Sequence, residues 1–462
     1  MTARIATQVT RARAAMATLK GASQARVDEA VTALAWAIHK PEHARELAEL
    51  AVAGTGLGNV PDKIAKNTRK TFGALRDLLR AKTVGIIEED PARGLVKYAK
   101  PVGVVAAVCP STNPAATPAN KAMMALKGAN AVIIAPSPAG HATSARYVEL
   151  ARAELTRAGF APDLIQVLAA PIDKAATSTL MALADLVVVT GSQNNVRRAY
   201  SSGTPAIGVG AGNVPVIIDE TADLDDAADK IMRSKVFDNA TSCSSENSVI
   251  LLDEVYGAAI AALERAGGFL ATDEARQRVL DTLWRDGHLN RHIIAKDMAV
   301  LANAFGLGAE AGQAKFLMVE ETGIGDGYPL SGEKLSLVLT VYRARDFEHA
   351  KGLAHDILAH QGMGHSCGIH TMRPERARAL AEELDVVRVL VNQAHTFGNG
   401  GSFDNGLAFT LSMGCGTWAG NSISENLNYR HFINITHLVT TIPEDKPSEE
   451  TLFGPYWEKF GR

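Results

Sequence analysis

The chain has 462 residues, 47% of them hydrophobic, which is enough for two or three domains of roughly 100–200 residues with large buried cores. A net charge of −3 indicates no strongly basic face, so nucleic acid is not an expected partner. The apolar runs are short, well below the roughly 18 residues of a membrane span, and the N-terminal segment lacks the apolar core of a secretory signal.

Helical periodicity dominates residues 23–82, where apolar side chains recur at the spacing of helix faces. Two strand-like runs around Pro91 then predict a projecting hairpin at residues 83–100. From residue 102 the pattern changes to short apolar runs, each followed by a helical segment. Such alternation predicts a doubly wound parallel sheet, which binds ligands outside the carboxyl ends of its strands. The runs are "VGVVAAV", "NAVIIAP", "LIQVLAA" and "DLVVVTG".

A second series of apolar runs follows Cys243, through "NSVILLD", "AKFLMVEE" and "LSLVLTVYRA". We therefore predict an α/β fold with two such domains. The expected ranges are 1–236 for the first domain, 237–420 for the second, and 421–462 for a C-terminal return that contains the strand-like "HFINITHLVTTI".

Four cysteines lie far apart and form no Cys-x-x-Cys pair, which is typical of reduced thiols in a cytoplasmic enzyme. They are Cys109, Cys243, Cys367 and Cys415. Four histidines recur every five residues, at His355, His360, His365 and His370. A step of five residues turns about 140° on a helix, so the four would not share a face and we predict no metal site. Acid–base chemistry by one of them is the more plausible function.

Three loops at predicted strand ends are candidates for ligand contacts. "CPSTNP" presents Asn113, which either faces a ligand or caps a helix or Asx turn. "TGSQNN" (190–195) either holds a phosphate at a helix start or is a plain turn. "GVGAGN" (208–213) lacks the order Gly-x-Gly-x-x-Gly and precedes a strand, so we reject it as a nucleotide-binding motif.

Four segments in this order carry a more specific signal: "YSSGTPAIGVGAGNVPVIIDETADL", "FDNATSCSSENSVI", "EKLSLVLTVYRARDFEHA" and "LSMGCGTWAGNSISENL". Together they resemble the aldehyde dehydrogenase superfamily, in particular its CoA-acylating branch, over roughly residues 100–440. The resemblance implies a Rossmann-like cofactor domain, an α/β catalytic domain and an oligomerisation hairpin. It also implies that a strand near 431–442 joins the hairpin across subunits of a homodimer or homotetramer.

Carried over residue by residue, the resemblance makes Cys243 the catalytic nucleophile and Asn113 a contributor to the oxyanion hole. Glu333 matches a glutamate on the cofactor side of the site, and His365 matches a histidine implicated in acylating members. The expected cofactor-binding residues, besides Glu333, are Pro110, Ser137, Thr190, Gly191 and Ser192.

Two departures from the hydrolytic branch are informative. The stretch "IGVGAGN" has no glutamate to activate water, and Ala135 stands where a lysine is usual. We therefore expect coenzyme A, a better nucleophile than water, to discharge a Cys243 thioester, with His365 accepting the thiol proton or merely packing a loop. The expected cofactor is NADP or NAD. Because Pro138 follows Ser137, no carboxylate stands at this position to repel the 2′-phosphate of NADP.

The substrate is expected to be a small aldehyde. The C-terminal stretch "GNSISENLNYRHFINITHL" is most similar to acylating sulfoacetaldehyde dehydrogenases, and acetaldehyde, propionaldehyde and succinic semialdehyde members are the alternatives. A sulfonate requires hydroxyl, cationic or backbone N–H donors. Candidate donors are Thr241, Ser244, Ser245, Arg430 and His431. A hydrolytic enzyme and a non-catalytic binding protein are the rival functions.

Overall fold

Five short apolar strands form one parallel sheet in the computed structural model, which describes residues 2–462. Their order is β5-β4-β3-β6-β7, so the chain starts in the middle and adds strands first on one side and then on the other. Every position of β3, β4 and β6 is buried because helices cover both faces. The strands are β3 (Val104–Val108), β4 (Ala131–Ala135), β5 (Ile165–Val167), β6 (Leu186–Val189) and β7 (Ala206–Gly208).

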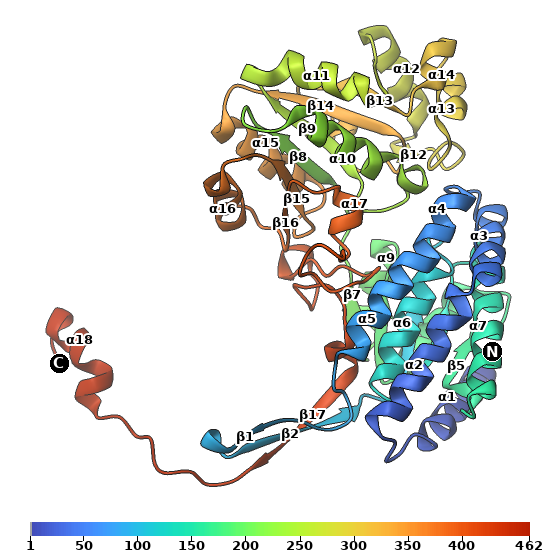
Figure 1. The fold of residues 1–462 in the computed structure, drawn as a ribbon, viewed down its shortest axis with the longest axis vertical. Helices are drawn as coiled ribbons and strands as arrows, with labels where there is room; N and C mark the ends of the chain where they lie inside the picture. Colours follow the sequence, from blue (N-terminus) through green and yellow to red (C-terminus); the bar gives the residue numbers. More distant parts are fainter. Residues whose placement is uncertain (1) are drawn as a thin grey trace.

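The predicted helical segments around this sheet are all present (Figure 1). Between α4 and α5 the helix widens into a π-type turn at Lys66–Lys70, a feature often found at functional sites. The helices are α1 (Thr2–Ala17), α2 (Gln24–His39), α3 (Pro41–Thr55), α4 (Val60–Ala65), α5 (Thr71–Leu79), α6 (Ala116–Lys127), α7 (His141–Arg157), α8 (Lys174–Leu183) and α9 (Gln193–Tyr200).

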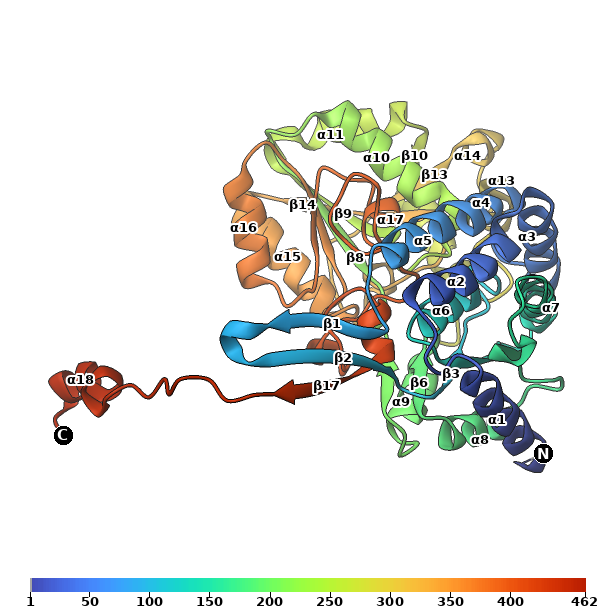
Figure 2. The same cartoon turned by 60° about the horizontal axis from the view of Figure 1, so that its bottom comes forward.

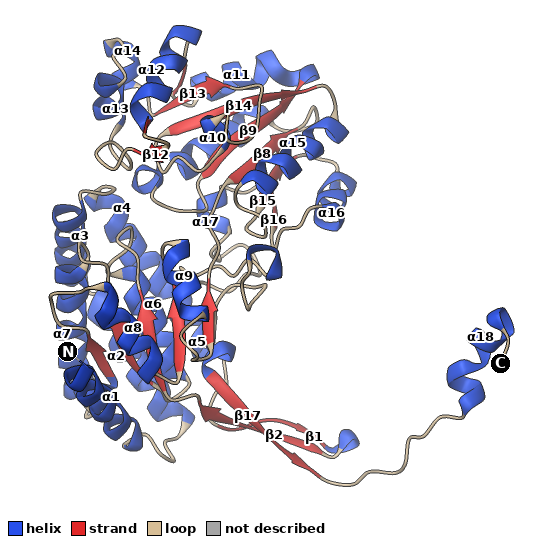
Figure 3. Ribbon diagram, turned by 180° about the vertical axis from the view of Figure 1, so that it is seen from behind, coloured by secondary structure: helices blue, strands red, loops and turns tan. Residues whose placement is uncertain are grey.

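A second parallel sheet forms the other lobe, with the order β10-β13-β14-β9-β8-β15-β16 (Figure 3). Its core lies on both faces, because β8 sends Val216 to one apolar cluster and Ile217 to the other. The strands are β8 (Val214–Ile218), β9 (Glu246–Leu252), β10 (Gly268–Leu270), β13 (Phe316–Glu320), β14 (Val338–Ala344), β15 (Cys367–His370) and β16 (Val389–Val391).

The change of lobe comes earlier in the sequence than the expected boundary at 236/237. Strand β8 pairs with β9 and β15, so it belongs to the second sheet, and the crossing segment is residues 209–213. Other elements of this lobe are α10 (Leu224–Val236), α11 (Tyr256–Arg265), α12 (Asp273–Leu283), β11 (Trp284–Arg285), β12 (His288–Leu289), α13 (Met298–Ala304), α14 (Ala309–Gln313), α15 (Phe347–His360), α16 (Pro374–Glu383) and α17 (His395–Gly398).

A three-stranded antiparallel arm projects from the first lobe (Figure 2). The predicted hairpin consists of β1 (Gly85–Asp90) and β2 (Leu95–Pro101), joined by a short turn that begins at Pro91. Strand β17 (Ile433–Val439) pairs with β2 of the same chain, so the expected pairing across subunits is wrong. Beyond it lies α18 (Glu449–Phe460), which has no buried residue. Within residues 2–462, no helix is both long and apolar enough to cross a membrane.

Candidate active site

The candidate nucleophile lies in the loop that joins α10 to β9, just before β9 begins. Cys243 is partly exposed, whereas the other three cysteines are buried. Burial and the nearby Glu333 carboxyl raise the pKa of the Cys243 thiol to about 12, and Arg388 acts in the opposite direction. Among the four thiols, Cys243 is thus the one that a reagent can reach.

His365 contacts this thiol from the loop before β15, which lies on the other side of β8 from β9. Its Nε2 atom lies 3.4 Å from Sγ of Cys243, and its Nδ1 atom lies 2.7 Å from the Ser366 hydroxyl. Burial, with help from Arg388 and His395, lowers the pKa of His365 well below its ordinary value, so the ring is neutral at physiological pH. The structure therefore brings together two residues that the sequence placed in one site.

The other three histidines of the series lie elsewhere. His355 is exposed beside Asp356, His360 lies 3.9 Å from Asp326, and His370 is buried within β15. Among the described residues, no group of three or more His, Cys, Asp or Glu side chains is arranged to hold a metal ion.

The site lies at the amino ends of neighbouring strands in the second sheet. The parallel order β14-β9-β8-β15 places Glu333, Cys243, the segment 208–213 and His365 in adjacent loops before these strands. Burial raises the pKa of Glu333 to about 7, although Lys334 and Lys235 oppose this shift. One edge of the sheet thus gathers a thiol, an imidazole and a carboxyl group.

Asn113 lies in the loop between β3 and α6 and is half-buried. Helix α6 begins at Ala116, and its N-cap residue is Ala115, with no side-chain cap, so Asn113 does not cap this helix. The carbonyl of Asn113 accepts a hydrogen bond of 3.3 Å from the Thr117 N–H. The side-chain amide of Asn113 is therefore not needed to start the helix.

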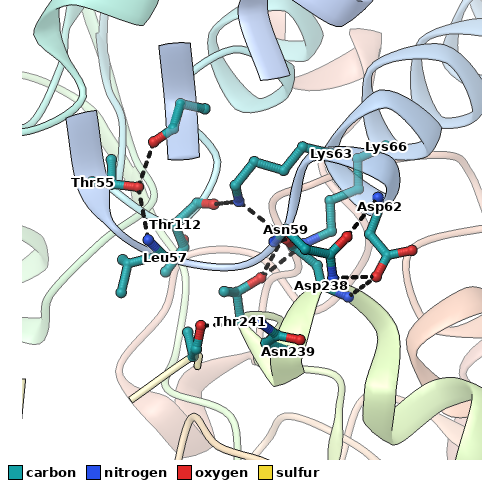
Figure 4. Close-up of polar contacts among 12 residues, drawn as sticks. Thr55, Leu57, Asn59, Asp62, Lys63, Lys66, Thr112, Asp238, Asn239 and Thr241 are labelled. Atoms are coloured by element: carbon teal, nitrogen blue, oxygen red, sulfur yellow. Dashed lines mark hydrogen bonds and ion pairs between the residues drawn. The ribbon is translucent and has the colours of Figure 1, made fainter. Parts of the chain in front are cut away.

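A buried ionic cluster joins this loop to the nucleophile loop (Figure 4). The Asp238 carboxylate accepts from Lys63 at 2.9 Å, from Lys66 at 2.5 Å and from the Thr241 hydroxyl at 2.7 Å. Lys63 also donates to the carbonyl of Thr112 at 2.9 Å, next to Asn113. We refer to Lys63, Lys66 and Asp238 as the Asp238 clamp.

The clamp holds backbone that would otherwise relax. Asp238, Asn239 and Ala240 all have left-handed φ angles, of 52°, 53° and 59°. Such a conformation costs about 1–2 kcal/mol for each residue other than glycine. The Asp238 side chain also accepts from the Asn59 N–H, and the Asp238 N–H donates to Asp62. The first lobe thereby fixes the path of the chain shortly before Cys243.

The segment 208–213, rejected above as a nucleotide-binding motif, packs against the nucleophile. A Cβ atom added to Gly212 would lie 2.0 Å from the carbonyl oxygen of Cys243, and one added to Gly210 would lie 2.7 Å from Sγ of Cys415. Gly212 is thus required by its close approach to the Cys243 backbone, and Gly210 by its close approach to the Cys415 side chain. No pattern in the sequence signals this function.

A sequence profile described as the aldehyde dehydrogenase family matches residues 2–278. The chain belongs to this family. A sulfoacetaldehyde dehydrogenase (acylating) from Cupriavidus necator is 54% identical over 459 residues, covering 99% of this chain and 93% of that protein. A succinate-semialdehyde dehydrogenase (acetylating) from Clostridium kluyveri is 40% identical, covering 96% of this chain and 98% of that protein.

A solved structure leads to the same family. The crystal structure of an acetylating aldehyde dehydrogenase from Geobacillus thermoglucosidasius has a TM-score of 0.93 at 35% identity, and the match covers 97% of this chain and 98% of that one. The resemblance to this family and the predicted α/β fold class are confirmed.

Five of the six expected cofactor-binding residues of this family member lie around the point where the strand order of the first sheet reverses, whereas Glu333 lies before β14 in the second lobe. Pro110 follows β3, Ser137 follows β4, and Thr190, Gly191 and Ser192 follow β6. In open parallel sheets this crevice is the usual place for a dinucleotide. Helix α9 begins after Ser192 without a side-chain cap, which leaves its first N–H groups for a phosphate. The residues present therefore fit a dinucleotide.

Three side chains organise this crevice. The Lys121 ammonium is buried and donates to the carbonyls of Val108 and Val188, at the carboxyl ends of β3 and β6. The Thr190 hydroxyl lies 2.5 Å from the Ser412 hydroxyl, so the turn after β6 is tied to the C-terminal segment. The Ser137 hydroxyl accepts from the Gly140 N–H and closes its own turn.

The five candidate sulfonate donors have different partners. Thr241 is engaged by the Asp238 clamp, and Ser244 bonds to Asn399 and Met413. The Ser245 hydroxyl is buried and has no hydrogen-bond partner. Arg430 and His431 both pair with Glu425 in the turn before β17. Of the five, Ser245 is thus the candidate whose hydroxyl is without a partner.

Sequence reasoning missed several residues of the site. Lys63 and Lys66 lie more than 170 positions before Asp238, and nothing local to them signals the contact. Arg388 donates to the His365 carbonyl, and His395 bonds to Ser366. Buried cations and histidines of this kind show no periodic pattern, and only the folded chain brings them together.

Proposed function

We propose that this protein is a CoA-acylating aldehyde dehydrogenase that converts sulfoacetaldehyde, coenzyme A and NADP or NAD to sulfoacetyl-CoA and the reduced cofactor, or catalyses the reverse reaction. The observation that carries the proposal is the contact between Cys243 and His365, at a site where the adjoining segment 208–213 has no acidic side chain. Relatives with acylating names along nearly the whole chain support it.

The reaction begins with the Cys243 thiolate, which adds to the aldehyde carbon and forms a thiohemiacetal. The Asn113 amide and the Cys243 N–H are proposed to hold the resulting oxyanion, and losing one such donor typically costs about 10²–10³ in rate. A bound nicotinamide would supply the acceptor for the hydride of this thiohemiacetal. Cys243 then carries the acyl group as a thioester.

The second half-reaction exchanges one thioester for another. Water needs a positioned base to attack, a contribution of about 10²–10⁴. The absence of an acid in residues 208–213, together with the close approach of Gly212 to Cys243, leaves no base there. The thiol of coenzyme A loses its proton to solvent and attacks the acyl carbon, and the Cys243 thiolate leaves. His365 is the group within reach of that sulfur.

Two buried hydroxyls without partners support a polar headgroup on the substrate. Ser245 follows the nucleophile by two positions, and Thr117 lies one helical turn after Asn113. Orphaned donors of this kind are costly unless a ligand engages them. We propose that they donate to a sulfonate. Ser245→Ala and Thr117→Val should raise KM for sulfoacetaldehyde at least about tenfold, and should change KM for acetaldehyde little.

A CoA-dependent assay tests the function. Steady reduction of NADP or NAD should require both sulfoacetaldehyde and coenzyme A, and kcat/KM should exceed that for succinic semialdehyde, acetaldehyde and propionaldehyde. Steady turnover without coenzyme A would indicate a hydrolytic enzyme, and no turnover with any aldehyde would indicate a binding protein. A preference for the uncharged aldehydes would refute the sulfonate assignment alone.

We also propose a cytoplasmic homodimer or homotetramer that assembles through the arm. Leu438 and Val439 of β17 are 50% and 66% exposed, so this edge strand presents an apolar side chain on each face that association would cover. Light scattering of the intact protein should show two or four chains. Replacing both residues with lysine should favour the monomer, and an unchanged mass would contradict assembly through this strand.

A further inference from the structure

A buried hydrogen-bonded chain extends from the nucleophile into the second lobe. Beyond His365, the Ser366 hydroxyl lies 2.7 Å from Nδ1 of His365 and 2.9 Å from Nε2 of His395. Ser366 and His395 are buried. The mechanism proposed above uses neither Ser366 nor His395, although His365 links both of them to Cys243.

The Ser366 hydroxyl has one proton, so it donates to one imidazole and accepts from the other. If it donates to His365, then Nε2 of His395 carries a proton, and the proton of neutral His365 is on Nε2, facing Cys243. If it donates to His395, then the proton of His365 is on Nδ1 and its Nε2 is bare. The tautomers of the two histidines are therefore coupled through one hydroxyl.

The surroundings of His395 favour the first arrangement. Its Nδ1 atom is buried without a hydrogen-bond partner and faces Gly368, where an added Cβ would lie 3.1 Å away. A buried N–H without an acceptor is rarer and costlier than a lone pair beside a C–H group. Nδ1 of His395 is thus the bare nitrogen, and the proton is on its Nε2.

We propose that Ser366 and His395 are positioning residues that hold the proton of His365 on Nε2, where it is donated to the sulfur of Cys243. This inference rests on the proposed function of Cys243 as nucleophile. In this tautomer Nε2 stabilises the thiolate before attack and again when it leaves the thioester. Because Nε2 of His365 then carries a proton and donates it to Cys243, this atom does not accept the proton of the CoA thiol, contrary to what was expected from the sequence.

Several charged or titratable groups lie around the hydrogen-bonded chain from Cys243 to His395, and they are the same in every variant described below. Cys243 faces Glu333, Cys415 and Arg388. His365 faces Arg388, and His395 faces Arg388 and His370. The backbone N–H of His395 donates to the Glu246 carboxyl, whose pKa burial raises to about 7. Comparisons between variants that retain these groups therefore isolate the hydrogen-bonded chain.

Alkylation of Cys243 by iodoacetamide tests the proposal without aldehyde or coenzyme A, so its failure is separable from failure of the proposed function. Cys109, Cys367 and Cys415 are buried, and mass spectrometry identifies the labelled thiol. At pH 8, His365→Ala should slow labelling about tenfold or more, and Ser366→Ala about three- to tenfold. His395→Leu should slow it less, because Ser366 is then free to donate either way.

A double-mutant cycle distinguishes positioning from general damage. In the His365→Ala background, adding Ser366→Ala or His395→Leu should have no further effect, because both act through His365. Ser336→Ala is the matched control, since Ser336 is equally buried and its hydroxyl has no partner. Additive effects in the double variants, or wild-type labelling by Ser366→Ala, would overturn the proposal.

Neutron diffraction from the crystalline protein locates the proton directly. We expect deuterium on Nε2 of both histidines and none on Nδ1 of His395. Deuterium on Nδ1 of His395 would refute the tautomer assignment even if the labelling rates agreed with it.

Discussion

The Nε2 atom of His365 lies 3.4 Å from Sγ of Cys243, although 122 positions separate the two residues. The contact follows from sheet order, because β9 and β15 flank β8 and both residues immediately precede their strands. Crossing from β7 to β8 also brings the carboxyl edge of the first sheet, where a dinucleotide fits, toward this amino edge of the second. The geometry of the site is therefore a consequence of topology.

Cys243→Ala should abolish the formation of reduced cofactor, because no other thiol is placed to carry the acyl group. Binding of the cofactor, measured by fluorescence titration, should persist, since the crevice belongs to the first sheet. Cys367→Ala is the matched control, because Cys367 is fully buried within β15. Substantial turnover by Cys243→Ala would contradict the assignment.

His365→Ala should slow thioester release more than thioester formation. Loss of the donor raises the thiol pKa, which makes the thiolate rarer but also more nucleophilic, so attack is partly compensated. A higher thiol pKa makes the same thiolate a poorer leaving group, so the release of the thioester is not compensated. Rapid-quench kinetics should show a burst of reduced cofactor followed by a steady rate reduced about tenfold or more. A normal burst together with an unchanged steady rate would rule out this function for His365.

Asp238→Asn should destabilise the protein by about 3–5 kcal/mol, because it leaves the Lys63 and Lys66 ammonium groups buried without a counter-charge. It should also lower kcat, because the left-handed residues 238–240 lose their restraint. Asp225→Asn, which removes an exposed ion pair with Arg265, should change stability by less than about 1 kcal/mol. Equal midpoints of thermal unfolding for the two variants would refute the clamp.

The clamp also has a defined pH dependence. Burial opposes ionisation of Asp238, but Lys66 and Lys63 outweigh it and lower the pKa of the carboxyl. A group whose pKa is lower in the folded state stabilises the protein above its unfolded value of about 3.9, and this stability is lost as pH falls through the folded value. Wild type and Asp238→Asn should therefore converge in thermal stability only at strongly acidic pH.

Pro138→Glu should shift cofactor preference toward NAD. Pro138 is exposed directly after Ser137, where a carboxylate would repel the 2′-phosphate of NADP and accept from a ribose hydroxyl. The ratio of kcat/KM for NADP to that for NAD should fall about tenfold or more. Pro138→Gln has the same shape without the charge and should retain the wild-type ratio. A large preference of the wild-type protein for NAD would contradict the premise that nothing near Ser137 repels the 2′-phosphate of NADP.

Local patterns in the sequence were sufficient for most of the helices, the longer strands and the hairpin around Pro91, but not for the short strands β7, β10, β11, β12 and β16. They were not sufficient for the sheet to which β8 belongs, because "VPVIID" has the same apolar pattern as the strands of the first lobe. The resemblance to a family supplied Cys243 and His365. It did not supply Ser366 and His395, whose function depends on a hydroxyl lying between two rings, a relation that neither spacing nor periodicity records.

Gly212→Ala tests whether the segment 208–213 is required to place the nucleophile. The added methyl group would lie 2.0 Å from the carbonyl oxygen of Cys243 and 2.7 Å from its Cβ, and backbone cannot yield as a flexible side chain does. A displacement of about 1 Å at a reacting group costs roughly 10²-fold in rate, so kcat should fall by that order while both lobes remain folded.

The control for this variant is Gly257→Ala in α11, where the added methyl group meets nothing within 4 Å. Alanine is favoured over glycine inside a helix by roughly 0.5–1 kcal/mol, so this variant should be fully active and slightly more stable. Comparing kcat with the circular dichroism melting curve separates the two effects. Gly212→Ala with wild-type kcat would mean that the loop yields, and that close packing against Cys243 does not position the thiol.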